Sequence, residues 1–154
     1  MKELDSRAWR AFHRISSRLL PHLGRQVTAH SGISSAEYVV LVALYEAPFP
    51  SINVNKLAVS LGWEISRMSH QISRMQEHGL VFKEQNERDA RCFDVWITDK
   101  GKQIAESAIP LQSLEINHCF SNVLTPEQMK SLIEISDAIS SHMKEHHPTT
   151  KKEQ

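Results

Sequence analysis

Apolar residues recur at every third or fourth position along most of the chain, and this period predicts helices. The first helix is expected over residues 5–31, with Asp5 as its N-terminal cap. The second is expected over residues 34–45, because Ser34 and Glu37 have the spacing of a capping box, in which each side chain binds a free backbone amide of the other. The first third of the chain is therefore expected to be helical.

Two short helices joined by a tight turn are expected next. Residues 51–52 can form a short strand, and Asn53 can cap a compact helix over residues 53–61. A second helix is expected over residues 64–78, with Gly79 as its C-terminal stop. The turn between the two helices is only a few residues long.

The period of the pattern changes after residue 80. Residues 81–83 predict a strand, residues 84–90 a polar connection, and residues 92–98 a second strand in which apolar and polar side chains alternate. Two strands with this separation predict a β-hairpin.

Two further helices complete the chain. One is expected from Thr98-Asp99 to Phe120, and the other begins at a capping sequence formed by Thr125 and Gln128. The second ends before Pro148, and a polar tail follows. The predicted fold class is mainly α (α+β).

The order helix, tight turn, helix, hairpin is typical of a winged helix-turn-helix domain, whose second helix enters the major groove of DNA. Helical periodicity divides residues 64–78 into two faces. The inner face carries Ile65, Met68, Ile72 and Met75. The outer face has no acidic residue at its centre and carries Ser66, Arg67, His70, Ser73 and Arg74. These side chains can bond base edges and phosphates, and we also expect DNA contacts from Ser69 and Gln71.

The hairpin carries a second set of candidate DNA contacts. Arg88 and Arg91 flank Asp89 near its tip, and a slender tip with arginine can enter a minor groove. Asp89 can hold one arginine in place for this contact. The alternative is a solvated ion pair in a turn.

Composition narrows the classes of function without selecting one. Lysine and arginine total 18 and aspartate and glutamate 18, so bulk charge does not argue for nucleic acid, and the only clear basic excess lies in residues 1–32. No apolar run approaches the roughly 20 residues that cross a bilayer, and a cytoplasmic protein is expected. Cys92 and Cys119 are too few for a disulfide scaffold, so inert thiols are expected, with oxidation sensing as the alternative.

Four motifs follow one another along the chain. They are the run 32–38, Leu57-Ala58, Arg74-Met75 followed by Gly79-Leu80-Val81, and Asp89-Ala90-Arg91 followed by Val95, Ile97-Thr98 and Gly101. In this order they resemble the MarR family of bacterial winged helix-turn-helix regulators, and the similarity extends over about residues 5–145. The resemblance implies a homodimer that binds a pseudopalindromic double-stranded DNA operator, as a repressor released by a small aromatic effector.

The resemblance also assigns parts of the chain to these roles. It implies dimerisation helices in residues 1–32 and 102–147, a DNA-binding domain in residues 33–101, and a polar tail in residues 148–154. The effector is expected near the junction of the dimerisation helices and the DNA-binding domain. Its candidate contacts are Trp9, Phe12, His13 and Tyr38, although core packing is the alternative for such aromatic residues. No cofactor and no metal are expected.

Three other functions could use a chain of this predicted fold. The sequence has no glycine-rich phosphate loop, nucleophile elbow or His-Glu-x-x-His motif, so an enzyme is not expected. A metal-sensing or thiol-sensing regulator of the same fold stays open, because a histidine cluster lies near the C-terminus and His118 precedes Cys119; the cluster is His142, His146 and His147. A winged helix used only for protein contacts is disfavoured by the arginines of the hairpin.

Overall fold

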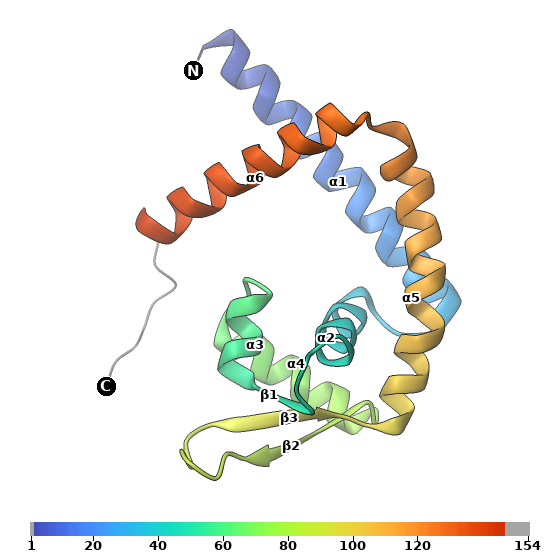
Figure 1. Cartoon of the computed structure of the whole chain (residues 1–154), viewed down its shortest axis with the longest axis vertical. Coiled ribbons are helices and arrows are strands. Elements are labelled where there is room, and N and C mark those ends of the chain that lie inside the picture. Colours follow the sequence, from blue (N-terminus) through green and yellow to red (C-terminus); the bar gives the residue numbers. More distant parts are fainter. Residues whose placement is uncertain (1, 147–154) are drawn as a thin grey trace. The chain divides into compact units, whose positions relative to one another are not determined.

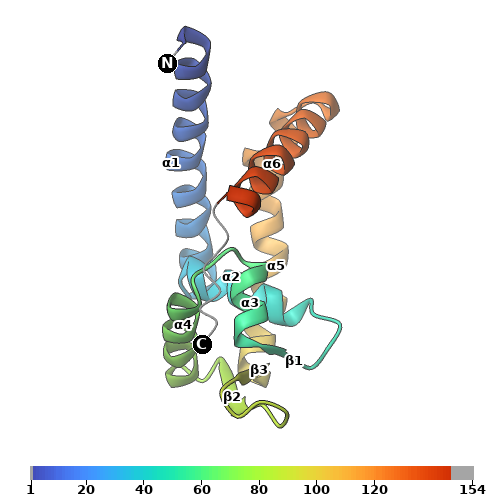
Figure 2. The same cartoon turned by 90° about the vertical axis from the view of Figure 1, so that its left-hand side faces the viewer.

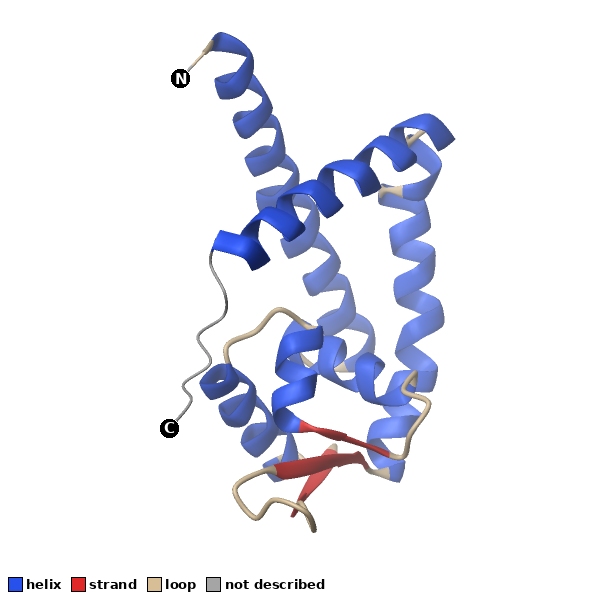
Figure 3. Cartoon of the chain, turned by 60° about the vertical axis from the view of Figure 1, so that its left-hand side comes forward, coloured by secondary structure: helices blue, strands red, loops and turns tan. Residues whose placement is uncertain are grey.

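The computed structural model describes residues 2–146 and confirms a mainly helical chain with one small sheet (Figure 3). The elements, in chain order, are α1 (Glu3–Ser31), α2 (Ser35–Tyr45), β1 (Ser51–Asn53), α3 (Val54–Ser60), α4 (Ile65–Glu77), β2 (Val81–Gln85), β3 (Phe93–Ile97), α5 (Asp99–Cys119), the 3₁₀ helix η1 (Ser121–Val123) and α6 (Pro126–His146). The polar tail expected over residues 148–154 lies outside the described residues.

The chain divides into two compact units. The first runs to Ile116 and contains α1 to α4, the sheet and most of α5. The second begins at Asn117 and contains η1 and α6. Within it the predicted capping sequence is confirmed, since the Thr125 N–H donates to Gln128 Oε1 at 2.9 Å and the Gln128 N–H to Thr125 Oγ1 at 3.2 Å.

The predicted helix starts are confirmed at α2 and α3 and shifted at α1. The backbone N–H of Ser34 donates to Glu37 Oε2 at 2.8 Å, and the Glu37 N–H donates back to Ser34 Oγ at 3.2 Å. Asn53 Oδ1 accepts the Asn55 N–H at 3.0 Å. The expected cap at Asp5 is wrong, because α1 begins at Glu3 and Asp5 lies inside its first turn, where it accepts the Lys2 N–H.

The three strands form an antiparallel sheet in the order β1-β3-β2. Val95 of the central strand lies opposite Ile52 of β1 and Lys83 of β2, and it is fully buried. β2 reaches Gln85, two residues further than the pattern predicts, and β3 begins at Phe93, so the connection lies at residues 86–92 instead of 84–90. The hairpin projects from the helices as a slender wing, and α3 and α4 lie side by side above it (Figures 1 and 2).

The core lies between α2, α3, α4 and the sheet. Met68, Ile72 and Met75 are buried on the inner face of α4, as their spacing predicts. Ile65 was expected beside them but is 46% exposed. It is the first residue of α4, and the helix reaches the core only one turn later, at Met68.

The base of the wing is joined to α5 through Thr98. The Thr98 hydroxyl oxygen Oγ1 lies within hydrogen-bond distance of two carbonyl oxygens, that of Gly79 at 2.7 Å and that of Leu80 at 3.0 Å. The same oxygen accepts the Gly101 N–H at 3.0 Å. The Thr98 N–H also donates to the Leu80 carbonyl at 3.1 Å. The end of α4, the start of β2 and the start of α5 are therefore tied to one side chain.

Among the described helices, none is by itself long and apolar enough to span a membrane; α1 and α2 meet that criterion only when taken together, with a bend of 77° between them.

Candidate nucleic-acid interface

The outward face of α4 lies open to solvent. The helix is held to the domain by its buried methionines and Ile72, and this fixes which side chains point away. Five of the predicted contacts are exposed, namely Ser66, Arg67, Ser69, His70 and Arg74, whereas Gln71 and Ser73 are half-buried. Acidic residues are absent from α4 until Glu77 at its end. The face therefore presents donors and positive charge without a competing carboxylate at its centre.

Arg67 is stacked on a residue that the sequence reasoning did not select. Its guanidinium carbon lies 4.0 Å from the centre of the Trp63 ring. Trp63 sits in the turn between α3 and α4, where its backbone N–H donates to the Ala58 carbonyl at 2.9 Å. The one available signal was the separation of four residues, which places two side chains near each other at the start of a helix.

Lys83 connects α4 to the wing and was also missed. Its ammonium donates to Ser73 Oγ at 3.3 Å and lies 5.4 Å from the centre of the Phe93 ring. Its backbone N–H donates to Gln76 Oε1 at 3.1 Å. These contacts fix the wing strand β2 against the recognition side of α4.

Short-range hydrogen bonds shape the tip of the wing. Asn86 Oδ1 accepts the backbone N–H groups of Arg88 at 2.9 Å and Asp89 at 3.0 Å. Asp89 Oδ1 accepts both the backbone N–H of Arg91 at 3.1 Å and its side-chain Nε at 3.2 Å. The side-chain hydrogen bond from Arg91, assisted by the backbone one, holds the pKa of the Asp89 carboxyl below its ordinary value. Asp89 thus pairs with Arg91, whose side chain stays 87% exposed. This arrangement fits both alternatives, an aspartate that orients the arginine and a solvated ion pair in a turn.

Residues 33–93 match the family model described as the MarR family. This segment is a MarR-family domain. The match spans α2 to the start of β3, which includes the candidate interface on α4 and the tip of the wing. MarR-family proteins are transcriptional regulators and not enzymes, so the choice of a regulator over an enzyme is confirmed.

Two transcriptional regulators are similar to the chain over most of its length. The transcriptional regulator HosA of Escherichia coli O157:H7 is 25% identical over 127 residues, which cover 82% of this chain and 91% of HosA. The uncharacterised HTH-type regulator YkoM of Bacillus subtilis (strain 168) is 27% identical over 81% of this chain and 79% of YkoM.

Solved MarR-family structures show the same fold. Sco3205 of Streptomyces coelicolor, solved in complex with DNA, is 28% identical, with a TM-score of 0.88 over 93% of each chain. AbsC from the same organism is 25% identical, with a TM-score of 0.88 over 95% of this chain and 98% of AbsC.

The four candidate effector contacts of this chain are not brought together within one copy. The rings of Trp9 and Phe12 lie 5.9 Å apart, and both residues and His13 are exposed on α1. Tyr38 packs against the core from α2, where burial, followed by the charge of Glu46, raises the pKa of its hydroxyl. α1 meets α2 near Gly24, and 15 residues of helix place Trp9 about 20 Å from there (Figure 2).

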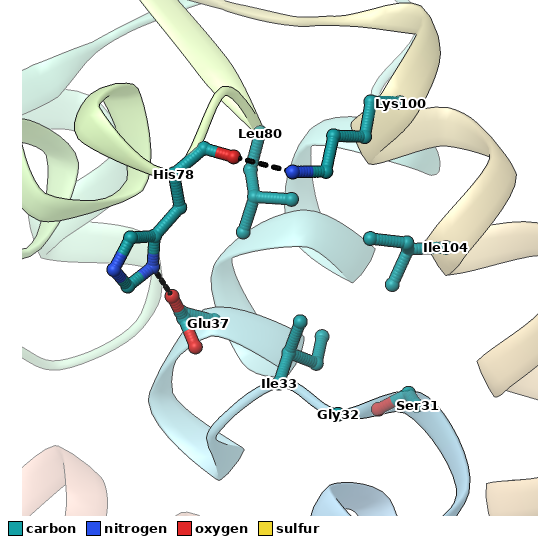
Figure 4. A pocket seen from close by; sticks show the side chains of 8 residues that line it. All are labelled: Ser31, Gly32, Ile33, Glu37, His78, Leu80, Lys100 and Ile104. Atoms are coloured by element: carbon teal, nitrogen blue, oxygen red, sulfur yellow. Dashed lines mark hydrogen bonds and ion pairs between the residues drawn. The ribbon is translucent and has the colours of Figure 1, made fainter.

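A pocket of about 400 Å³ lies instead at the end of α4 (Figure 4). It is lined by Ser31, Gly32, Ile33, Glu37, His78, Leu80, Lys100 and Ile104. Glu37 Oε1 lies 2.6 Å from His78 Nδ1, and the Lys100 ammonium donates to the His78 carbonyl at 2.8 Å. The pattern of the sequence identified Glu37 only as a capping residue and did not select His78 or Lys100.

Glu37 is buried, yet it stays ionised. Burial raises the pKa of its carboxyl, but the hydrogen bonds from the Ser34 backbone and the His78 ring outweigh that effect and hold the pKa below its ordinary value. The carboxylate therefore joins the start of α2 to the end of α4 by charge-assisted hydrogen bonds.

The metal and thiol alternatives stay predictions. His147 and the side chain of His146 lie outside what the structure describes, and His142 belongs to α6. Cys92 and Cys119 are free thiols, both half-buried. Cys92 lies near the tip of the wing, with its sulfur 3.7 Å from Asp89 Oδ2.

Proposed function

We propose that the chain binds a pseudopalindromic double-stranded DNA operator as a homodimer and represses transcription until a small aromatic effector releases it. The observation that carries this proposal is the exposed, acid-free face of α4 beside a wing that carries Arg88 and Arg91. Support for the repressor role comes from the transcriptional repressor MprA of Escherichia coli (strain K12), which is 22% identical over 74% of this chain and 64% of MprA.

The chemistry of the two surfaces suits two different parts of DNA. Arginine can form two hydrogen bonds to the O6 and N7 atoms of guanine, and serine, glutamine and histidine can bond bases or phosphates in the major groove. At the tip of the wing, the Arg91 side chain is 87% exposed and pairs with Asp89. An exposed pair of this kind is weak, so the arginine can exchange the carboxylate for a phosphate or a narrow minor groove at little cost.

Exposed apolar side chains on the terminal helices support the homodimer. α1 exposes Leu4, Trp9, Phe12, Ile15 and Leu20. α6, taken by itself, exposes Leu132, Ile133, Ile135, Ile139 and Met143. Apolar surface of this extent on a single chain is typically covered by a partner, and a second copy would supply the two-fold symmetry of an inverted-repeat operator.

The experiment that tests DNA binding compares two arginine variants of the full chain. The operator is first selected from randomised duplex DNA, and the affinity of the wild type, Arg91→Ala and Arg25→Ala is then measured by fluorescence anisotropy at several salt concentrations. We expect Arg91→Ala to lower affinity about tenfold or more and to reduce the log–log salt slope by about two, because one arginine is lost from each copy of the dimer. Arg25→Ala removes an exposed arginine of α1 and should bind as the wild type does.

Two further measurements complete this test. Light scattering should give the mass of a dimer for the wild type and for both variants, so that weaker binding is not a consequence of dissociation. Unchanged operator affinity of Arg91→Ala would contradict the role of the wing, whereas a monomer that binds with full affinity would contradict the homodimer. Release of the operator by members of a panel of small aromatic acids tests the effector, with light scattering to show that the released protein is still a dimer.

A further inference from the structure

One arginine of the α4 face is held in place before any DNA is bound. The guanidinium of Arg67 lies over the face of the Trp63 ring at 4.0 Å, a distance typical of a cation–π contact. Trp63 is itself fixed, because its ring packs against the core and its backbone is hydrogen-bonded to Ala58. The ring is therefore an immobile support for the guanidinium.

This contact leaves the hydrogen-bonding groups of the guanidinium unused. A cation–π contact engages the charge and not the N–H donors, of which arginine has five in a fixed fork. Among residues 2–146, no hydrogen bond or ion pair is formed by the Arg67 side chain, and Glu64, three residues earlier, does not pair with it. By contrast, the Nε–H group of Arg91 on the wing already donates a hydrogen bond to Asp89 Oδ1.

Resting on the proposed function, we infer that Trp63 is a positioning residue that presents Arg67 to a guanine of the operator. Reading guanine requires two parallel N–H groups held in one plane, and a long side chain normally loses much conformational freedom to meet that requirement. The Trp63 ring removes part of this cost before binding. Arg74, on the same face but without such an aromatic support, serves in this scheme as a contact to phosphate.

The scheme separates two arginines that are alike in type and exposure. Arg67 should set which base is accepted at one position of each half-site, because its donors are aligned in advance. Arg74 should strengthen binding to any duplex, because a phosphate accepts a charge from many directions. The identity of the base pair read by the chain should therefore depend on Trp63, a residue that need not touch DNA.

The test measures affinity for the selected operator, for operators with each guanine replaced, and for a scrambled duplex. The proteins are the full-length wild type, Trp63→Leu, Trp63→Phe, Arg67→Ala, Arg74→Ala and the double variant Trp63→Leu/Arg67→Ala. We expect Arg67→Ala to lose about tenfold in discrimination at one guanine, and Trp63→Leu to lose about threefold or more at the same guanine with unchanged affinity for the scrambled duplex. In the double variant the loss should equal that of Arg67→Ala alone.

Two controls keep the outcome clear. Arg74→Ala should weaken binding to all duplexes by the same factor. Trp63→Phe keeps an aromatic face, so it should retain most of the discrimination. If circular dichroism shows that the leucine variant is unfolded, Trp63→Met, which also lacks an aromatic face, takes its place with the same expected loss. NMR of the free protein gives a readout without DNA, because the ring should shift the Arg67 side-chain resonances upfield in the wild type and not in the leucine variant.

The outcomes distinguish this inference from the function on which it rests. If the wild type enriches no sequence, the proposed function fails and the inference fails with it. If the wild type enriches an operator but the losses of Trp63→Leu and Arg67→Ala multiply in the double variant, only the inference is overturned. Equal losses of Trp63→Leu on the operator and the scrambled duplex would also overturn it.

Discussion

The substitution Gly101→Ala tests how the wing is anchored to the rest of the domain. Gly101 is buried in the first turn of α5, where that helix passes the base of the hairpin. A methyl group added there would collide with the carbonyl oxygen of Leu80, and it would stand 2.9 Å from Ile97 Cγ1 and 3.2 Å from Leu41 Cδ2. Only a residue without a side chain fits between α5 and the backbone of the wing.

The cost follows from what would have to move. The Leu80 carbonyl accepts from both the N–H and the Oγ1 of Thr98, so it cannot shift without weakening those hydrogen bonds. Overpacking a core typically costs about 1–3 kcal/mol, and each weakened hydrogen bond costs about 1 kcal/mol. The better helix propensity of alanine returns about 1 kcal/mol. We expect the free energy of unfolding to fall by about 2–4 kcal/mol.

Urea denaturation followed by circular dichroism measures this change. Wild type and variants are compared at one protein concentration, because the stability of a dimer depends on concentration. The matched control is Gly24→Ala, the same change inside α1, where the nearest atom is Ser35 Cβ at 3.3 Å and no backbone carbonyl stands in the way. The control should alter the free energy of unfolding by less than about 1 kcal/mol. A Gly101→Ala protein as stable as this control would refute the described packing of α5 on the wing.

Three other predictions follow from the same structure. The folded pKa of Glu37 is depressed, so its stabilisation is complete above its unfolded pKa of about 4.3 and is lost as pH falls through the lower folded value. A Glu37→Gln variant should therefore show a smaller drop in the urea midpoint on acidification, and superimposable acid titrations would contradict this. Thr98→Val should cost about 1–3 kcal/mol in urea unfolding, because it removes the side-chain links to Gly79 and Leu80. Met68→Ala should cost about 2–5 kcal/mol, while Ile65→Ala should cost less than about 1.5 kcal/mol; equal losses would argue against the exposed position of Ile65.

Local rules account for the parts of the fold that the sequence predicts well. Helix starts were readable at Ser34, Asn53 and Thr125, because capping depends on residues two or three positions apart. The error at Ile65 has the same origin. Periodicity tells which side of a helix a residue faces, but not where along the helix the core begins, and that depends on how the neighbouring elements end.

The sequence predicts which side chains share the exposed face of one helix, but not the contacts between different elements of the site. The polar face of α4 follows from periodicity, so its exposure could be anticipated. Contacts between elements could not, because pairs such as Lys83 with Ser73 and His78 with Glu37 lie 10 and 41 residues apart in the chain. Trp63 was missed for another reason, since an aromatic residue in a turn resembles ordinary core until its face is seen to carry Arg67.

The salt dependence of binding links the proposed roles of the arginines. The chain has a formal net charge of +0, so attraction to DNA has to come from the few cations at the interface. The exposed arginines on the α4 face and the wing are Arg67, Arg74, Arg88 and Arg91. If all four arginines of each copy neutralised phosphates, the log–log salt slope of operator affinity for a dimer would be about −7; with Arg67 on a base instead, the slope would be about −5.

Conversion of Arg67 to alanine should then change base discrimination and leave the slope almost unchanged, whereas Arg74→Ala should flatten the slope and leave discrimination intact. A slope much steeper than −7 would require cations besides these arginines, and Lys83 of β2, which contacts Ser73 of α4, would be the first to examine.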